Sequence, residues 1–366
     1  MKIKRSILFL TPLLVTLLLI SCEKKVAPEV PTVETSAISN ITGNTATGGG
    51  NIIDEGSSTV VERGIYWSTR PPSTSFGEKT EDGSGAGSFT SNLTNLKANT
   101  TYYVKAYATN DSGTGYGKEI NFKTAFVDYT GQTGTVSDVD NNTYPTIGIG
   151  GQIWMAVSLK TTNYSNGTSI PLVTDKSNWL ALTATSKAYC WYNDDIANKA
   201  TYGALYTWAA AMNGVASTTA NPSGIQGVCP TGWHLPSDAE WSQMENYLAD
   251  NGYNYDGTTG GGRDKIAKSL ASTSGWTSSS NTGAVGNTDY PAYRNKSDFT
   301  ALPGGYRIHD GTFLGIGYYS IWWSATEYDG LDGTFAWSHY LHYSISYVRS
   351  SPSDKNTGFS VRCVRD

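Results

Sequence analysis

The chain of 366 residues has little charge, few cysteines and no long hydrophobic run beyond its first residues. Only 16% of the residues are charged, with 26 Lys and Arg against 31 Asp and Glu, for a net charge of -5. A surface that tracks nucleic-acid phosphates needs clustered Lys and Arg, so we expect no nucleic acid as a partner. After the N-terminal segment no stretch reaches the roughly 20 apolar residues of a membrane-spanning helix. The 40 Gly, 24 Tyr and 11 Trp instead favour an extracellular, β-rich protein of two or three domains.

The N-terminus has the pattern of an export signal. Basic residues in Lys2–Arg5 precede an apolar run over 7–20, which has the length of a secretory signal and is too short for a membrane span. The run ends in Leu19-Ile20-Ser21-Cys22, which resembles the lipobox of bacterial lipoproteins. The resemblance implies a signal peptide over 1–21 and lipidation of Cys22, so that acyl chains attach the protein to a membrane. The alternative is a cysteine that ends an ordinary signal by chance.

The expected location is the outer membrane, through this lipid anchor. Residues 22–35 are rich in Lys, Glu, Pro and Val without a helical or strand period, which indicates a tether. The charged start Glu23-Lys24-Lys25 has the character of a sorting signal, but it does not say whether the protein faces the periplasm or the cell exterior.

Four cysteines are few for a chain of this length, and lipidation would use one of them. Cys190, Cys229 and Cys363 would then lie in an oxidising compartment, where one disulfide and one free thiol is the simplest arrangement. The residues by themselves do not say which two pair. The chain has no Cys-x-x-Cys motif, so we expect no structural zinc site.

Residues 36–124 show short β segments separated by Gly, Asn and Ser turns. Apolar and polar side chains alternate over 102–109, as in a strand with one buried face. Leu96, Thr100 and this alternating run resemble a stretch of fibronectin type III domains, with Ala98 where that family usually has Pro. The resemblance implies an immunoglobulin-like β-sandwich. Most such modules are spacers, and we expect a spacer here.

The pattern changes after this segment. Residues 125–145 are rich in Thr, Gly, Asp and Asn, so we expect a linker. Apolar runs on both sides of a Gly-Gly pair predict a hairpin over 146–155. Apolar residues at helical spacing predict a helix over 205–212, and the capping box Ser237-Asp238-Ala239-Glu240 predicts a second helix that ends before Gly252. Helices embedded among antiparallel strands indicate an α+β domain.

Five stretches follow one another in the second half of the chain: Gly151-Gln152-Ile153-Trp154-Met155, Ala188–Asp194, Tyr202–Trp208, Cys229–Trp241 and Phe359–Arg365. Together they resemble the Fibrobacter succinogenes major paralogous domain, a family of exported and often lipid-anchored proteins of Bacteroidetes and related bacteria. The resemblance implies a domain over 146–366. It implies architecture more than function, because no biochemical activity is established for that family.

Leu235–Trp241, Leu302–Tyr306 and Gly358–Arg365 also resemble the domain of formylglycine-generating enzymes, which has a C-type-lectin-like fold. That resemblance implies that the first and last strands of the domain pair. It also implies a disulfide between Cys229 and Cys363 that pins the terminal strand to the helical layer and leaves one thiol free. The expected fold is multidomain, with an N-terminal all-β immunoglobulin-like sandwich followed by an α+β C-type-lectin-like domain.

No catalytic motif accompanies these resemblances. The oxidase activity of formylglycine-generating enzymes needs a close pair of cysteines, and 338–350 contains none. His339 and His342 are an odd number of positions apart and would point to opposite faces of a strand, so we expect no shared metal site. A nucleophilic Cys190 would need a base such as His234, and a core or disulfide-bonded cysteine is favoured. We expect no enzyme; the alternative is an uncharacterised extracytoplasmic hydrolase acting on polysaccharide.

The sequence indicates no cofactor, although a structural calcium stays open because oxygen-rich loops suit that ion. Sugar-binding C-type lectins hold calcium partly through a Trp-Asn-Asp sequence on a late strand. Here the similar Tyr192-Asn193-Asp194 precedes the second predicted helix. The calcium site of those lectins therefore does not carry over to this chain.

The aromatic residues carry the functional expectation. Their rings offer flat apolar faces with polar edges, which suit sugars or partner proteins. The candidates for ligand contact are Trp191, Trp276, Trp322, Trp323, Tyr328 and Trp337. The sequence thus predicts a cell-surface or periplasm-facing lipoprotein that acts as a non-catalytic binding or adhesion module, for a glycan or an extracellular protein.

Overall fold

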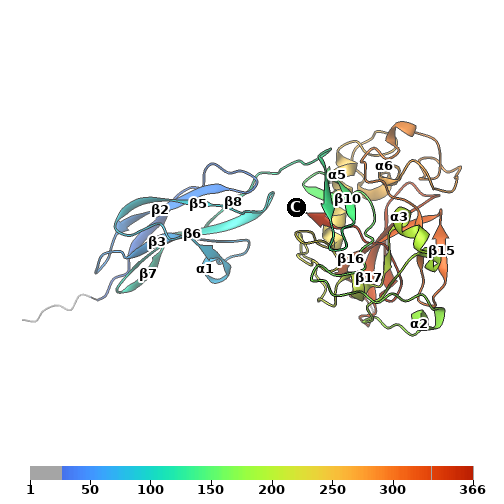
Figure 1. Ribbon diagram of the computed structural model, residues 1–366. Coiled ribbons are helices and arrows are strands. Elements are labelled where there is room, and N and C mark those ends of the chain that lie inside the picture. Colours follow the sequence, from blue (N-terminus) through green and yellow to red (C-terminus); the bar gives the residue numbers. More distant parts are fainter. Residues whose placement is uncertain (1–26, 331, 366) are drawn as a thin grey trace, which may run out of the picture. The chain divides into compact units, whose positions relative to one another are not determined.

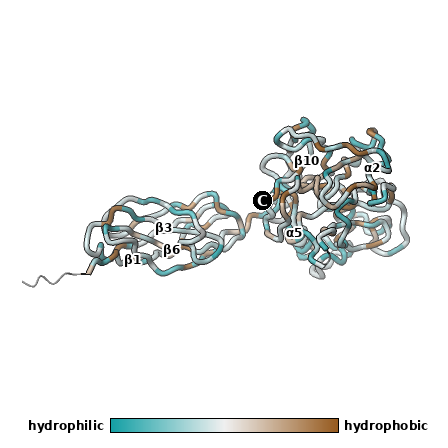
Figure 2. The backbone as a smooth tube through the Cα atoms, turned by 90° about the horizontal axis from the view of Figure 1, so that it is seen from below, coloured by the Kyte–Doolittle hydropathy of each residue, from teal (hydrophilic) through white to brown (hydrophobic). Residues whose placement is uncertain are grey.

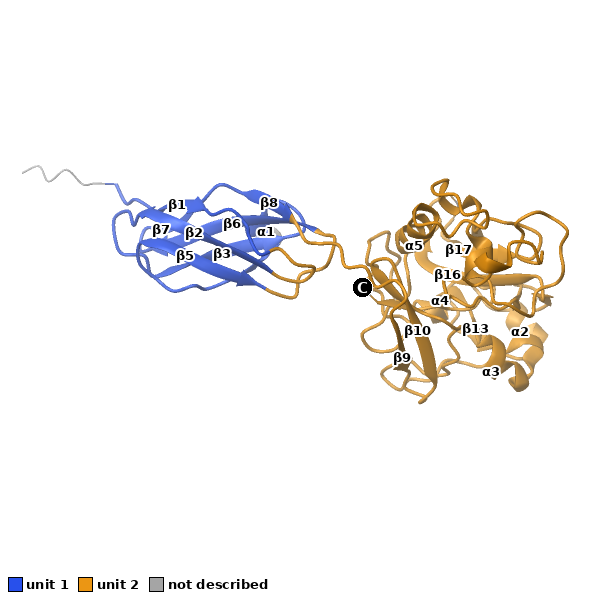
Figure 3. Ribbon diagram, turned by 90° about the horizontal axis from the view of Figure 1, so that it is seen from above, with its two compact units in different colours: residues 1–40, 46–93, 101–122 blue, residues 41–45, 94–100, 123–366 orange. Residues whose placement is uncertain are grey.

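The computed structural model describes residues 27–330 and 332–365, which form two compact units (Figures 1 and 3). The first unit comprises residues up to 40, 46–93 and 101–122, and the second comprises 41–45, 94–100 and the chain from 123 onward. The predicted signal peptide 1–21 and the lipidation site Cys22 lie outside the described residues. Hydrophobic residues occur in short stretches along the described backbone (Figure 2), and no helix in this part of the chain is long and apolar enough to span a bilayer.

The first unit is a sandwich of two antiparallel sheets. One sheet has the order β1-β2-β5, formed by β1 (Thr32–Thr35), β2 (Ala46–Asp54) and β5 (Gly87–Leu93). The other has the order β4-β3-β6-β7, with β8 also on β6, formed by β4 (Glu78–Lys79), β3 (Glu62–Ser68), β6 (Thr101–Asn110), β7 (Gly113–Tyr116) and β8 (Ile120–Lys123). A short helix, α1 (Ser73–Phe76), lies between β3 and β4 in the chain.

The alternating run expected over 102–109 is the central strand β6. Tyr102, Val104 and Ala106 are buried, while the side chains between Tyr102 and Ala106 are only partly covered. This pattern buries one face of β6 in the sandwich core. The predicted tether 22–35 reaches too far, because its last four residues form β1 and pair with β2.

The second unit is a mixed α+β structure whose sheets surround a long helix. Its largest sheet has the order β19-β11-β10-β9, formed by β19 (Val364–Arg365), β11 (Gln152–Met155), β10 (Thr143–Ile149) and β9 (Thr133–Ser137). Three smaller sheets are formed by β12 (Tyr189–Cys190) with β13 (Leu205–Tyr206), β14 (Gly304–Arg307) with β15 (Phe313–Ile316), and β16 (Tyr319–Glu327), β17 (Phe335–His342) and β18 (Arg349–Asp354). The helices are α2 (Lys176–Leu180), α3 (Lys199–Tyr202), α4 (Trp208–Ala211), α5 (Asp238–Asp250) and α6 (Ala267–Leu270).

The predicted hairpin 146–155 is present as β10 and β11. The linker expected over 125–145 is different in the structure, because β9 lies within it and pairs with β10. Most residues of β9 are exposed, as expected for an edge strand. Because both faces of this edge strand carry exposed Thr, Gly and Ser, its sequence shows no alternation of apolar and polar residues. Its composition is therefore that of a linker.

The two predicted helices have different outcomes. The capping box is formed: Ser237 accepts from the Glu240 backbone N–H, and the Glu240 carboxylate accepts from the Ser237 backbone N–H, at the start of α5. The helix expected over 205–212 is wrong at its start, because Leu205 belongs to β13 and pairs with Cys190. Only α4 is helical there, with Thr207 as its N-cap.

The core between α5 and the sheets is built from stacked aromatic rings. Trp241 on α5 lies 4.7 Å from Trp154 on β11 and 5.5 Å from Trp322 on β16, measured between ring centroids. A disulfide joins Cys229, just before α5, to Cys363, just before β19. This is the pairing that the family resemblance implied, and Cys190 is free and buried.

Candidate functional site

Three of the predicted ligand-binding residues belong to the core instead. Trp322 and Trp323 are 0% exposed and Trp191 is 4% exposed. The Trp323 indole N–H donates to the Tyr206 carbonyl, which leaves it no hydrogen for a ligand. The prediction of ligand contact at these three positions is wrong, because large apolar rings were assigned to the surface although the fold buries them.

The other three candidates are half-buried but do not form one platform. Tyr328 and Trp337 contact each other edge to face, with ring centroids 5.2 Å apart. The Trp276 indole N–H is turned inward and donates to the Ser272 hydroxyl and the Ala301 carbonyl. The structure therefore offers a two-ring patch and an anchored indole rather than the crowded aromatic surface that the sequence suggested.

A longer aromatic surface lies on β14, β16 and β17 and beside the turn between β15 and β16. We call it the tyrosine strip; it consists of Tyr306, Tyr318, Tyr319, Tyr340, His342 and Tyr343. Tyr318 is 43% exposed, and the other five side chains are half-buried. The strip is therefore partly exposed to solvent, while Tyr306, Tyr319 and Tyr340 also pack against the core.

The rings of the tyrosine strip form a continuous series of contacts. From one end, ring centroids are 5.0 Å apart between Tyr318 and Tyr343, and 4.6 Å apart between Tyr343 and His342. The series continues from His342 to Tyr319 at 4.4 Å, and from Tyr319 to Tyr340 at 5.9 Å. Tyr319 also contacts Tyr306 at 5.7 Å. Each ring of the strip is therefore held by its neighbours, mostly in edge-to-face or tilted contacts.

The strand register creates this series. Tyr319 on β16 is directly opposite His342 on β17, and two positions further along Ile321 is opposite Tyr340. Side chains two residues apart share a face of a strand, so Tyr319, Tyr340 and His342 lie on the same face. Gly315 has φ of 78°, and a Cβ there would approach the Tyr319 ring to 2.8 Å. Glycine at this position of β15 therefore lets the Tyr319 ring pack.

Burial shifts the pKa of three groups of the strip, and one guanidinium lies beside it. Burial raises the pKa of Tyr306 and of Tyr340 and lowers the pKa of His342, so all three rings are uncharged at neutral pH. Arg349 on β18 is opposite Tyr340 and hydrogen-bonds to its side chain. The His342 Nδ1 atom lies 2.9 Å from the Ser344 hydroxyl.

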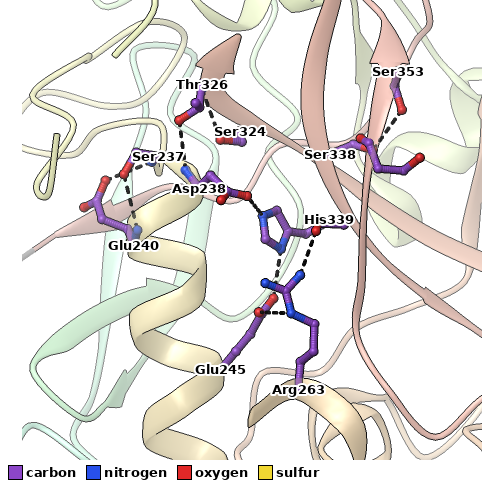
Figure 4. A network of polar contacts seen from close by, with 12 residues as sticks. Ser237, Asp238, Glu240, Glu245, Arg263, Ser324, Thr326, Ser338, His339 and Ser353 are labelled. Atoms are coloured by element: carbon purple, nitrogen blue, oxygen red, sulfur yellow. Dashed lines mark hydrogen bonds and ion pairs between the residues drawn. The ribbon is translucent and has the colours of Figure 1, made fainter. Parts of the chain in front are cut away.

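A separate cluster of charged groups joins α5 to β17 (Figure 4). The His339 Nε2 and Nδ1 atoms each lie 2.8 Å from a carboxylate oxygen, of Asp238 and Glu245 respectively. Arg263 approaches the second Glu245 oxygen at 3.3 Å, and the imidazole stacks on Trp241 with centroids 5.0 Å apart. His339 is 0% exposed, so its imidazole is inaccessible to a substrate.

The structure does not place Cys190 and His234 as a nucleophile and its base. Burial raises the pKa of the Cys190 thiol to about 12, and Arg307 opposes this only in part, so the thiol is not a nucleophile at neutral pH. His234, considered as its base, instead places Nε2 2.6 Å from the Glu240 carboxylate.

His339 is buried while His342 is half-buried, in keeping with opposite faces of β17. In the described part of the chain no three His, Cys, Asp or Glu side chains gather as metal ligands would.

The sequence contained a signal for the tyrosine strip that our reasoning did not use. Tyr340 and His342 follow the two-residue period of a strand, as Tyr319 and Ile321 do. The signal does not reveal which strands pair, and the strip exists only because β16 and β17 are in this register. We predicted ligand contact mainly for tryptophans because their rings are large. The same large apolar area is the reason that the fold buries them.

The fold and the tyrosine strip together define a class of protein with a β-sandwich followed by a disulfide-bonded α+β unit that displays aromatic side chains on a sheet. The chain belongs to the Fibrobacter succinogenes major domain family, whose model matches residues 147–365. This confirms the family to which the sequence motifs pointed. No curated protein matches the chain.

Several solved structures are similar to part of the chain. The sensor domain of the anti-sigma factor RsgI4 in Pseudobacteroides cellulosolvens is 15% identical, with a TM-score of 0.22, and the match covers 26% of this chain and 96% of that one. A human fibronectin type III domain is 14% identical, with a TM-score of 0.21 and coverage of 25% and 72%. Fibronectin domains of chicken CNTN1 are 19% identical, with a TM-score of 0.23 and coverage of 27% and 32%.

Proposed function

We propose that the second unit is a C-type-lectin-like, non-catalytic carbohydrate-binding module and that the tyrosine strip is its binding surface. The observation that carries the proposal is the unbroken series of ring contacts from Tyr318 to Tyr306 through Tyr343, His342 and Tyr319. The apolar C–H faces of sugar rings pack against aromatic faces, while tyrosine hydroxyl groups hydrogen-bond to sugar hydroxyls.

The pairing of terminal strands supports the C-type-lectin-like part of the proposal. Ile153 on β11 pairs with Arg365 on β19, and Trp154 pairs with Val364. The first and last parts of the second unit thus meet in one sheet, as the resemblance to formylglycine-generating enzymes implied. The disulfide before β19 fixes this arrangement.

The shape of the strip favours a sugar chain over a protein partner. A stable protein interface needs a broad apolar centre of several hundred Å² on each partner. The strip is narrow, and β18 beside it carries Ser351 and Ser353 on the same face as Arg349. A linear glycan fits a narrow aromatic track with polar margins.

Acid–base catalysis is not part of the proposal. The His339 cluster has the imidazole–carboxylate contacts that such catalysis uses, but the imidazole is fully buried between α5 and β17. Tyr306, Tyr340 and His342 are uncharged at neutral pH, and the strip lacks the paired carboxylates of a glycosidase. Binding without turnover is the function that these residues support.

We also propose that the protein is held at the outer membrane through Cys22, with the β-sandwich as a spacer. The lipobox-like sequence supports this part of the proposal. The Cys22→Ser variant should lose metabolic labelling with a clickable fatty acid. If the variant still incorporates the label, the anchor is not at this cysteine.

The binding proposal is tested by titrating plant and bacterial polysaccharide fragments into the purified protein by calorimetry. Tyr318→Ala removes an exposed ring and should weaken binding about tenfold, which is about 1.4 kcal/mol, without lowering the melting temperature. Tyr116→Ala is the matched control, because Tyr116 is equally exposed at 45% but lies in the first unit. Equal affinity of the Tyr318→Ala variant and the unaltered protein, or hydrolysis of the fragments, would refute the proposal.

A further inference from the structure

The segments that build the tyrosine strip contain few acidic residues. Residues 301–309, 311–326 and 335–353 contain no Asp or Glu. They include β14, β15 and β17, all of β16 except its last residue, Glu327, and the first five residues of β18. The whole chain has 31 acidic residues and a net charge of -5. The strip is therefore built from stretches without carboxylates in an acidic protein, and it borders a positive charge.

That charge belongs to Arg349, the first residue of β18. Arg349 is exposed and lies opposite Tyr340, to whose side chain it hydrogen-bonds. None of the ion pairs in the described part of the chain includes Arg349. A guanidinium has five N–H donors, so one bond to a tyrosine leaves most of them available.

Three other arginines of the second unit are used by the fold. Arg307 and Arg362 are buried and donate to backbone carbonyls, of Val173 and Met155 among others. Arg263 pairs with the buried Glu245. Arg349 differs from these three because its guanidinium is exposed, lacks a carboxylate and is held beside an aromatic surface.

We propose that the ligand of the tyrosine strip is an anionic carbohydrate, whose carboxylate or sulfate group is bound by Arg349. This inference rests on the proposed function, because it names the class of sugar that the same strip takes. The planar guanidinium matches the two oxygens of a carboxylate or sulfate with parallel hydrogen bonds. The Tyr340 hydroxyl group orients the guanidinium, while Tyr319 and Tyr318 stack against neighbouring sugar rings.

The alternating serines of β18 fit this arrangement. Ser351 and Ser353 follow Arg349 on the same face of the edge strand, opposite Ser338 and Ala336 on β17. Hydroxyl groups at this margin hydrogen-bond to a glycan without repelling its charge. A carboxylate at any of these positions would repel an acidic sugar at close range.

The test uses matched ligands that differ only in charge. Calorimetry with the purified protein compares oligogalacturonate with its methyl-esterified, neutral form, and a sulfated oligosaccharide with its desulfated form. We expect the acidic forms to bind at least tenfold more tightly, with an affinity that falls as salt concentration rises. Preference for the carboxylate pair or for the sulfate pair identifies which anion the site takes.

Arg349→Gln should remove this preference, so that acidic and neutral forms bind equally, and Arg349→Lys should restore it in part because it keeps the charge but loses the planar fork. Lys118→Gln, at an exposed cation of the first unit, is the control and should change nothing. If Arg349→Gln keeps the full preference, or if neutral forms bind as tightly as acidic ones to the unaltered protein, the inference is wrong while sugar binding stands. If no sugar binds and Tyr318→Ala has no effect, both proposals fail.

Discussion

At the scale of single residues, the most unusual group is the buried imidazole of His339. Both ring nitrogens face carboxylate oxygens, so both must carry hydrogen for the contacts to be attractive. Burial by itself lowers the pKa of His339, but Glu245 and Asp238 outweigh it and hold the pKa above its ordinary value. The folded state therefore holds His339 in its imidazolium form more strongly than the unfolded chain does.

The sign of the resulting pH dependence follows from linkage. A pKa that is higher in the folded state stabilises the protein fully below the unfolded value of about 6.5. This stability is lost as pH rises through the raised pKa of His339. We predict that the urea midpoint falls on the alkaline side of neutrality and that His339→Gln removes this dependence. The variant also loses stability at pH 6, by about 3 to 5 kcal/mol, because Glu245 is left buried with fewer partners.

Urea unfolding from pH 5 to 9, with His309→Gln as the control, measures both effects. His309 is more than half exposed, so its replacement should leave the pH profile unchanged. A flat profile for the unaltered protein, or the same profile for the His339→Gln variant, would show that the imidazolium does not contribute.

The position of a side chain was predictable from the sequence where it depends on local spacing. It was not predictable where it depends on burial in the folded protein. Sequence reasoning placed the histidines His339 and His342 on opposite faces from their spacing alone. It could not see that Trp322 and Trp323 lie inside, since strand β16 is covered on both faces and therefore shows no polar alternation. The tyrosine strip was missed for the related reason that half-buried tyrosines resemble ordinary surface residues.

At the scale of secondary-structure elements, helices with strong end signals were predictable and short strands were not. The capping box identified α5, and its apolar stripe is buried as expected. The two-residue strand β13 was predicted as the start of a helix, because Leu205 lies three residues before Trp208, which is a helical spacing. Pairing with β12 decides its conformation, and pairing partners are not visible in a single segment.

The N-terminus of α5 makes a second prediction. Ser237→Ala should destabilise the protein by about 1 kcal/mol, because the Glu240 backbone N–H loses its acceptor in a fully buried position. Ser242→Ala, within the same helix, is the matched control and should be neutral or slightly stabilising. Chemical denaturation followed by far-UV circular dichroism compares the two. Equal effects at both serines would mean that the capping box adds nothing.

At the scale of the whole molecule, the order of two units and the family of the second were predictable, while their boundaries were not. The sandwich begins earlier than expected, at β1, and the expected linker contributes β9 to the second unit. Both errors arise at edge strands, whose exposed polar residues have the composition of loops. Long-range pairing, which the sequence does not display, includes them in sheets.

The disulfide makes the third prediction, because it links positions 134 residues apart. Closing so long a loop restricts the unfolded chain and stabilises the fold by about 5 kcal/mol in the chain-entropy model. Reduction should lower the melting temperature of the second unit and leave the transition of the sandwich unchanged, since the first unit contains no cysteine up to residue 122 within its described part. Calorimetric scans with and without reductant measure this. An unchanged second transition in fully reduced protein would contradict it.

The central claim is that the tyrosine strip, and not the tryptophans suggested by the sequence, contacts a carbohydrate. Photo-crosslinking with a diazirine-bearing oligosaccharide, mapped by peptide mass spectrometry, tests it most directly. The account predicts labels on peptides that contain Tyr318, Tyr319, Tyr340 or Tyr343, which unlabelled oligosaccharide competes away. Competed labels confined to Trp276, to Tyr328 and Trp337, or to the first unit would contradict it.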